Sequence, residues 1–134
     1  MPLIKYEGET WTAADEPIPE FQVEAGEHLL LSVDDEPTAA HTSAAAIAIE
    51  FPAFNDGRGL SSAVLLRRLG YTGPLYAVGE VHPDIAHYMV RCGFSHLVLP
   101  ARFSSAEALA IVSPYSAHYQ GSALDPTPRF RRVS

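Results

Sequence analysis

The sequence predicts an α/β fold in which tandem βα units build a small, mainly parallel sheet with helices packed on it. Apolar runs suited to strands alternate with stretches whose apolar residues recur at helical spacing. Two of these helical stretches end in a glycine followed by an aromatic residue, Gly70-Tyr71 and Gly93-Phe94. A left-handed glycine commonly ends a helix, so the repeated pair indicates two similar βα units in tandem.

Strands are expected at residues 28–33, 46–51, 75–79 and 96–99. The strand at 46–51 is too apolar to alternate cleanly between polar and apolar residues. Such a run is typical of a strand in a sheet that helices cover on both faces.

Helices are expected at residues 61–69, 83–92 and 105–113. Ser61 is the predicted N-cap of the first helix, and Pro83 suits the first position of the second. Ser104 and Glu107 have the spacing of a capping box at the start of the third helix, which Pro114 is expected to end.

The two ends of the chain are less regular than its centre. Residues 1–27 combine Glu, Pro and Thr with scattered apolar anchors such as Trp11, which predicts an irregular N-terminal arm or short edge strands packed on the body. A short helix is expected at 38–43. The single α/β domain is expected to span 28–120, and the Arg-rich segment 121–134 to form a flexible tail.

Composition narrows the class of protein. The net charge of −7 argues against a nucleic-acid partner, because phosphate binding needs clustered positive charge. Residues 1–50 carry eleven acidic side chains and one lysine, which predicts either a solvated acidic surface or a docking face for a partner. No apolar run approaches the ~20 residues of a membrane span. The single cysteine, Cys92, agrees with a reducing compartment, so we expect a cytoplasmic protein.

The loop after the strand at 46–51 has the composition of an anion site. The run Asp56-Gly57-Arg58-Gly59, followed by Ser61, lies between an apolar strand and an apolar helix. Its glycines would let backbone N–H groups approach a small anion, and Arg58 would supply positive charge. All five residues are candidates for ligand binding. The same run is compatible with a purely structural turn in which Asp56 caps N–H groups and Arg58 pairs internally.

Parallel strands bring the residues that follow them to one edge of the sheet, which adds Glu80, His82 and Arg102 to this loop. Arg102 is a further ligand-binding candidate, and Glu80 and His82 are the candidates for acid–base catalysis. We expect no cofactor, because the Gly-x-Gly run lacks the remaining residues of the dinucleotide and phosphate-loop fingerprints. No metal site is expected, since His82, His87 and Cys92 are spaced to point in different directions around a helix.

The second predicted helix has a polar stripe as well as an apolar one. Asp84, His87, Tyr88 and Arg91 fall at helical spacing on one side. Tyrosine and arginine are enriched at protein interfaces, so the stripe is compatible with a homodimer contact as well as with a solvated face.

The chain resembles a bacterial family known as domain of unknown function 934. The likeness rests on five motifs spread in order over about residues 28–120: the run from Phe51 to Ser61, Leu65-Leu66-Arg67, Gly70-Tyr71-x-Gly73, Ala77-Val78-Gly79 and Arg91-Cys92-Gly93-Phe94. Members of that family are described as uncharacterised or provisionally as oxidoreductases, and their genes often accompany those for assimilatory sulfite reduction. The resemblance therefore implies a role in sulfur assimilation.

Two function classes follow from these observations. In the first, the chain is an accessory protein that holds a small oxyanion such as sulfite or sulfate, or a carboxylate of a sulfite-reduction partner, at the Asp-Gly-Arg-Gly loop. In the second, the same edge is the active site of an enzyme, an oxidoreductase, with Glu80 or His82 in proton transfer. The accessory role is the expectation we favour, because no cofactor motif accompanies the second.

Overall fold

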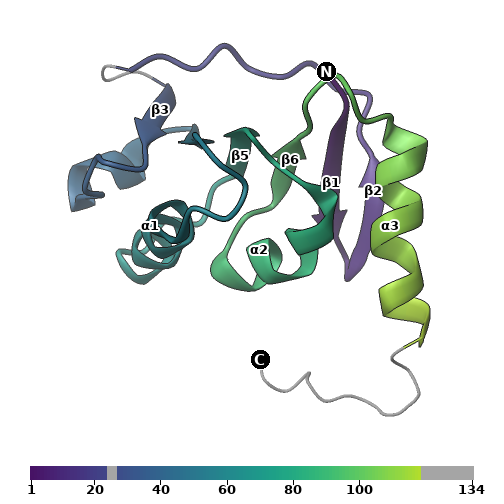
Figure 1. Ribbon diagram of the computed structural model, residues 1–134. Helices are drawn as coiled ribbons and strands as arrows, with labels where there is room; N and C mark the ends of the chain where they lie inside the picture. Colours follow the sequence, from purple (N-terminus) through teal and green to yellow (C-terminus); the bar gives the residue numbers. More distant parts are fainter. Residues whose placement is uncertain (24–26, 119–134) are drawn as a thin grey trace.

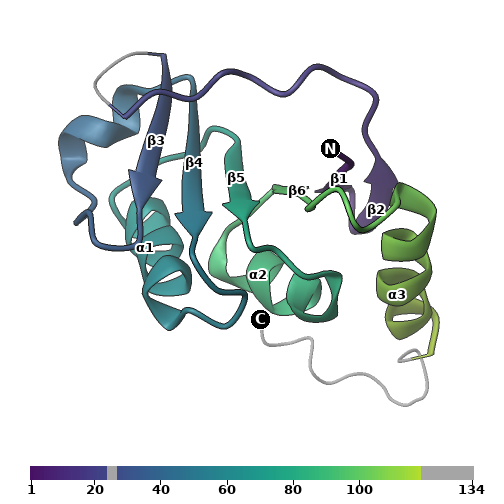
Figure 2. The same ribbon diagram turned by 45° about the horizontal axis from the view of Figure 1, so that its top comes forward.

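A computed structural model describes residues 1–23 and 27–118 of the chain, with side chains up to residue 112. Six strands form one sheet in the order β2-β1-β6-β5-β4-β3 (Figures 1 and 2). The strands are β1 (Leu3–Glu7), β2 (Thr10–Ala13), β3 (His28–Ser32), β4 (Ala46–Phe51), β5 (Leu75–Gly79) and β6 (His96–Val98). The predicted α/β fold is therefore confirmed. The predicted tail at 121–134, and residues 119–120, lie outside the described residues.

The sheet is mixed. β3, β4, β5 and β6 pair in parallel, as expected from the tandem βα units. β1 pairs antiparallel with β2 on one side and with β6 on the other. The N-terminal arm thus contributes a hairpin to the sheet, and only the segment between β2 and β3 lacks regular elements among its described residues.

Helices follow the central strands and are α1 (Gly57–Arg68), the 3-10 turn η2 (Pro83–Ile85) continued by α2 (Ala86–Cys92), and α3 (Ser105–His118). α1 begins four residues earlier than predicted, because Asp56 and not Ser61 is its N-cap. The predicted end of α3 at Pro114 is also wrong, since that helix continues to His118. Losing one backbone N–H does not have to end a helix. No helix in the described part of the chain has the length and apolarity to cross a membrane.

The capping box of α3 is formed as predicted. The Ser104 hydroxyl accepts from the Glu107 N–H at 3.0 Å, and the Glu107 carboxylate accepts from the Ser104 N–H at 2.9 Å. The short helix expected near 38–43 is the 3-10 turn η1 (Ala39–Ser43). Both elements satisfy backbone N–H groups that would otherwise lack partners at a helix start.

The core has one part on each face of the sheet, and among the side chains that the structure describes the helices contribute to one of these parts. Ile47 and Ile49 face the helices, with Leu66, Met89 and Val112 among their buried neighbours. We name residues 14–22, which cross the opposite face, the strap (Figures 1 and 2). Ala14, Ile18 and Phe21 of the strap pack there against a second cluster of buried side chains, which comprises Leu3, Ala46, Ala48, Tyr76 and Val98. The expectation of helices on both faces is therefore wrong, since a single extended segment covers the second face over the small alanines of β4.

Polar contacts fasten the strap to the sheet. The Glu16 carboxylate accepts from the Lys5 ammonium at 3.1 Å and lies 3.4 Å from Nε2 of His96. The His96 ring stacks on Tyr76, with ring centroids 4.4 Å apart, and its Nδ1 is 2.7 Å from the Ser95 hydroxyl. Burial lowers the pKa of His96, and the nearby Glu16 partly opposes that effect.

Arg67 joins the ends of the first two helices. Its Nε and Nη2 donate to the Gly93 carbonyl at 3.0 and 2.7 Å, and Nη1 donates to the carbonyls of Tyr71 and Gly73 at 2.9 and 2.8 Å. Gly70 and Gly93 have φ angles of 102° and 121°, which confirms both predicted helix stops. One half-buried guanidinium thus satisfies carbonyls at both stops.

Candidate functional site

The carboxyl ends of the four parallel strands point toward the same edge of the sheet (Figure 2). The loops that leave this edge carry most of the residues singled out in the sequence. The loop after β4 ends at Asp56, and the first turn of α1 holds Gly57, Arg58 and Gly59. The loop after β5 holds Glu80-Val81-His82, and the loop after β6 holds Arg102. Within this edge the side chains form two separate clusters.

The first cluster is built on the start of α1. The Asp56 carboxylate accepts from the Arg58 N–H at 3.0 Å, which caps the helix. The same carboxylate accepts from Nε and Nη2 of the Arg58 guanidinium at 3.1 and 2.8 Å. Arg58 Nη1 donates to Asp34, which follows β3, at 2.6 Å. Both roles considered for Asp56, helix cap and arginine partner, are therefore present together.

These contacts leave little of Arg58 for a ligand. Hydrogen bonds from the guanidinium lower the pKa of Asp56, and that carboxylate in turn raises the pKa of Arg58. Two carboxylates surround one cation, so the cluster of Asp34, Asp56 and Arg58 has a net charge of about −1. Such a cluster attracts cations more strongly than anions.

The other residues of the Asp-Gly-Arg-Gly run differ in accessibility. Gly57, Arg58 and Ser61 line an open groove of about 640 Å³ between α1 and the loop after β3. Gly59 is buried, and a Cβ atom there would lie 2.4 Å from the ring of Phe51. Its missing side chain therefore serves the packing of α1 on β4.

The second cluster forms where the chain leaves β5. Gly79 has a φ of 88° and sits so close to β4 that an added Cβ would be 2.6 Å from the Phe51 carbonyl oxygen. This turn directs Glu80 and His82 toward the loop after β6. Arg102 Nη2 donates to Glu80 Oε1 at 2.8 Å and lies 3.0 Å from Nε2 of His82. The hydrogen bond from Arg102 lowers the pKa of Glu80.

The His82 ring lies against the Arg102 guanidinium. A guanidinium can only donate, so their contact at 3.0 Å is a hydrogen bond when Nε2 of His82 accepts. Phe54 stacks on the ring with centroids 4.4 Å apart, and Phe103 meets it edge-on at 5.6 Å. Arg102 itself lies over the ring of Phe103 at 5.2 Å.

The two clusters share a loop but no side-chain contact recorded within the described residues. Phe54 comes from the loop that ends at Asp56, and it reaches the second cluster by stacking on His82. Sequence reasoning missed Asp34, Phe54 and Phe103. Each follows a parallel strand, so the rule that found the other residues applies to them as well.

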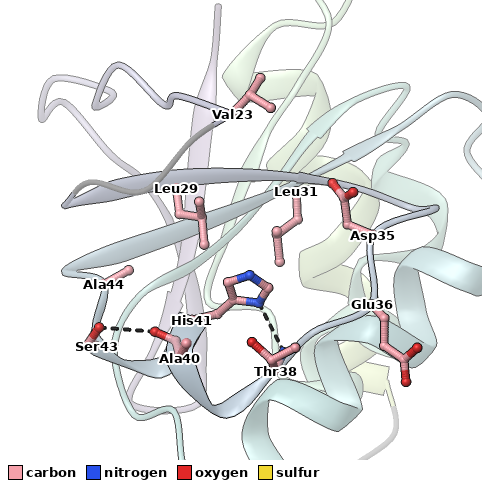
Figure 3. Close-up of a pocket in the computed structure, with 10 residues that line it drawn as sticks. All are labelled: Val23, Leu29, Leu31, Asp35, Glu36, Thr38, Ala40, His41, Ser43 and Ala44. Carbon is pink, nitrogen blue, oxygen red and sulfur yellow. Dashed lines mark hydrogen bonds between the residues drawn. The ribbon is translucent and has the colours of Figure 1, made fainter.

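Another hollow lies between β3 and η1 (Figure 3), and it shares Asp35 and Glu36 with the groove beside Arg58. It has a volume of about 590 Å³, and Leu29 and Leu31 of β3 line it on one side. The His41 ring points into it, while His41 Nδ1 accepts from the Thr38 N–H at 3.0 Å and so stabilises the start of η1. None of the residues predicted to bind a ligand lines this hollow.

The comparisons with known proteins agree with the motifs. A family model described as "Bacterial protein of unknown function (DUF934)" matches residues 29–130. The chain belongs to this family. The DUF934 match includes both clusters at the carboxyl edge, whereas β1, β2 and the strap precede it. No curated protein and no solved structure gives a significant match.

Proposed function

We propose that this DUF934 protein is an accessory protein of sulfur assimilation that binds a small sulfur oxyanion at Arg102. The observation that carries the proposal is that most donors of the Arg102 guanidinium have no partner among the described residues. Of its nitrogens, Nη2 alone makes hydrogen bonds within this part of the chain, and 52% of the side chain is exposed. Nε and Nη1 carry N–H groups on different sides of the guanidinium, and each can donate a charge-assisted hydrogen bond to an oxyanion.

The contrast between Arg58 and Arg102 favours the second cluster as the anion site. Arg58 donates from Nε, Nη1 and Nη2 to carboxylates, whereas Arg102 shares a single nitrogen with Glu80 and His82. The Arg58 cluster better suits a contact with a basic group of a sulfite-reduction partner.

Isothermal titration of the protein with sulfite at low ionic strength tests this proposal. We expect saturable, salt-sensitive binding that Arg102→Ala weakens by roughly 10- to 100-fold, the size of one lost charge-assisted contact. Arg58→Ala should weaken it much less. Arg68→Ala is the matched control, because it removes the same charge from an exposed position in the last turn of α1. Equal effects of all three substitutions would contradict a site at Arg102.

One observation favours the enzyme alternative. His82 Nε2 lies 3.7 Å from the Glu80 carboxylate, so two side chains of the kinds that transfer protons lie close together at the same edge. An enzyme with this pair should lose its rate on Glu80→Gln or His82→Ala while substrate binding persists. If sulfur substrates show neither binding nor turnover, the edge is better regarded as a protein-docking surface.

A further inference from the structure

We infer that Glu80 makes the Arg102 site selective for oxyanions that carry a proton, such as hydrogensulfite or hydrogenphosphate, over fully ionised sulfate. This inference rests on the proposed function and names the class of ligand. Its basis is the position of Glu80 Oε1, which is 2.8 Å from Nη2 of the guanidinium whose Nε and Nη1 remain for a ligand. An anion bound to Arg102 therefore shares one guanidinium with a carboxylate.

A carboxylate in that position interacts differently with an oxyanion that carries a proton and with a fully ionised one. It is ionised, because the hydrogen bond from Arg102 lowers the pKa of Glu80, and an ionised carboxylate can only accept hydrogen bonds. An oxyanion with an O–H group can donate that proton to Glu80 while its other oxygens accept from Arg102. Sulfate has no proton to donate near neutral pH, so its charge is simply repelled.

The surroundings hold Glu80 in place for this role. The Glu80 N–H donates to the Phe51 carbonyl at 2.9 Å, which ties the residue to the end of β4. His82 contacts the same Arg102 nitrogen, and its own position is held by the stacked ring of Phe54. About 44% of the Glu80 side chain is exposed, so a ligand can reach the carboxylate.

The test compares sulfite, phosphate and sulfate as ligands of the full chain near neutral pH, where the first two are partly protonated. We expect the wild type to bind sulfite and phosphate at least about tenfold more tightly than sulfate. Glu80→Gln keeps the side-chain oxygen that accepts from Arg102 but removes the charge. It should tighten sulfate binding and reduce the preference to less than about threefold.

Asp34→Asn is the matched control, since it removes the same charge from the neighbouring cluster and should leave the preference unchanged. A wild type that binds sulfate as tightly as sulfite would overturn the inference without any variant. So would a preference that persists in Glu80→Gln, although binding at Arg102 would then still stand. If none of the three anions binds to either protein, the proposed function fails together with this inference.

Discussion

Arg67 donates two hydrogen bonds to the carbonyl of Gly93, which lies 26 residues further along the chain. An added Cβ at Gly93 would lie 2.7 Å from Cγ of Arg67, so the glycine leaves room for the arginine stem as well as adopting its positive φ. The same guanidinium reaches the carbonyls of Tyr71 and Gly73. This contact joins two successive βα units and underlies the first predictions.

Arg67→Ala should destabilise the protein by about 2–3 kcal/mol, because it leaves several half-buried carbonyls without a donor. Arg67→Lys should recover only part of the loss, since an ammonium cannot reproduce the planar fork of donors. Chemical denaturation measures both effects. Arg68→Ala, one residue away and exposed, should stay within about 0.5 kcal/mol of the wild type. Equal midpoints for the two alanine variants would show that Arg67 is not a brace.

The two helix-stop glycines should differ in their tolerance of a side chain. A Cβ atom added at Gly70 would have no neighbouring atom within 4 Å. Gly70→Ala should therefore lower the free energy of unfolding by about 1–2 kcal/mol through its positive φ alone. Gly93→Ala carries the same strain and also collides with Arg67, so it should cost more. Combining Gly93→Ala with Arg67→Ala removes the collision, and the two losses should then be clearly less than additive. Strict additivity in a double-mutant cycle would contradict this account.

The stability of the protein should depend on pH through His96, which contacts Glu16 of the strap. Burial places the pKa of His96 below its ordinary value, so the unfolded chain takes up a proton more readily than the folded one. The free energy of unfolding should therefore fall as the pH is lowered through about 6.5 and stay level above it. His96→Phe keeps an aromatic ring on Tyr76 and should remove this dependence.

Glu16 acts in a different window. The hydrogen bond from Lys5 lowers the pKa of Glu16, so the contribution of Glu16 to stability is present above the ordinary carboxyl pKa and is lost at more acidic pH.

Identical pH profiles of stability for the wild type and His96→Phe between pH 5 and 7 would argue that His96 does not take up a proton on unfolding. Urea denaturation at a series of pH values separates the two contributions.

Arg58 should contribute little to stability, although all three nitrogens of its guanidinium donate hydrogen bonds. Its side chain is 59% exposed and its partner Asp34 is 77% exposed, so their pairing is screened by solvent. Arg58→Ala should change the free energy of unfolding by less than about 0.5 kcal/mol. Asp56→Ala also removes the cap of α1 and should cost about 1 kcal/mol. Thermal and chemical denaturation of the pair would detect the difference, and a large loss in Arg58→Ala would instead make this residue part of the fold.

Local sequence signals predicted much of the fold. The parallel strands and both Gly-aromatic helix stops depend on chemistry within a few residues, and the capping box of Ser104 and Glu107 is complete within one turn. An N-terminal arm packed on the body was predicted, but not that its residues 14–22 cover the face without helices. The partners of this strap on the sheet are far away in sequence, and an apolar strand looks the same under a helix or an extended segment. The antiparallel hairpin of β1 and β2 was weakly signalled for another reason, since its strands are only five and four residues long.

The edge of the sheet that holds the candidate site could be predicted, but the contacts among its side chains could not. The carboxyl-edge rule gathers Arg58, Glu80, His82 and Arg102 near one edge. It does not say that Asp34, 24 residues before Arg58, occupies one side of that guanidinium. Nor does it say that Arg102 and not Arg58 keeps donors available. Exposed ion pairs of this kind depend on loop geometry, which the sequence pattern leaves open.

The central claim, an oxyanion site at Arg102, is tested most directly by following arginine Nε–H signals in NMR spectra during a sulfite titration. Arg102→Lys and Arg58→Lys would assign the two signals. We predict that the Arg102 Nε–H signal shifts saturably, because this group has no recorded partner in the described chain, and that the Arg58 signal, bonded to Asp56, stays nearly in place. A saturable shift of Arg58 alone, or no shift of either signal at millimolar sulfite, would contradict the account.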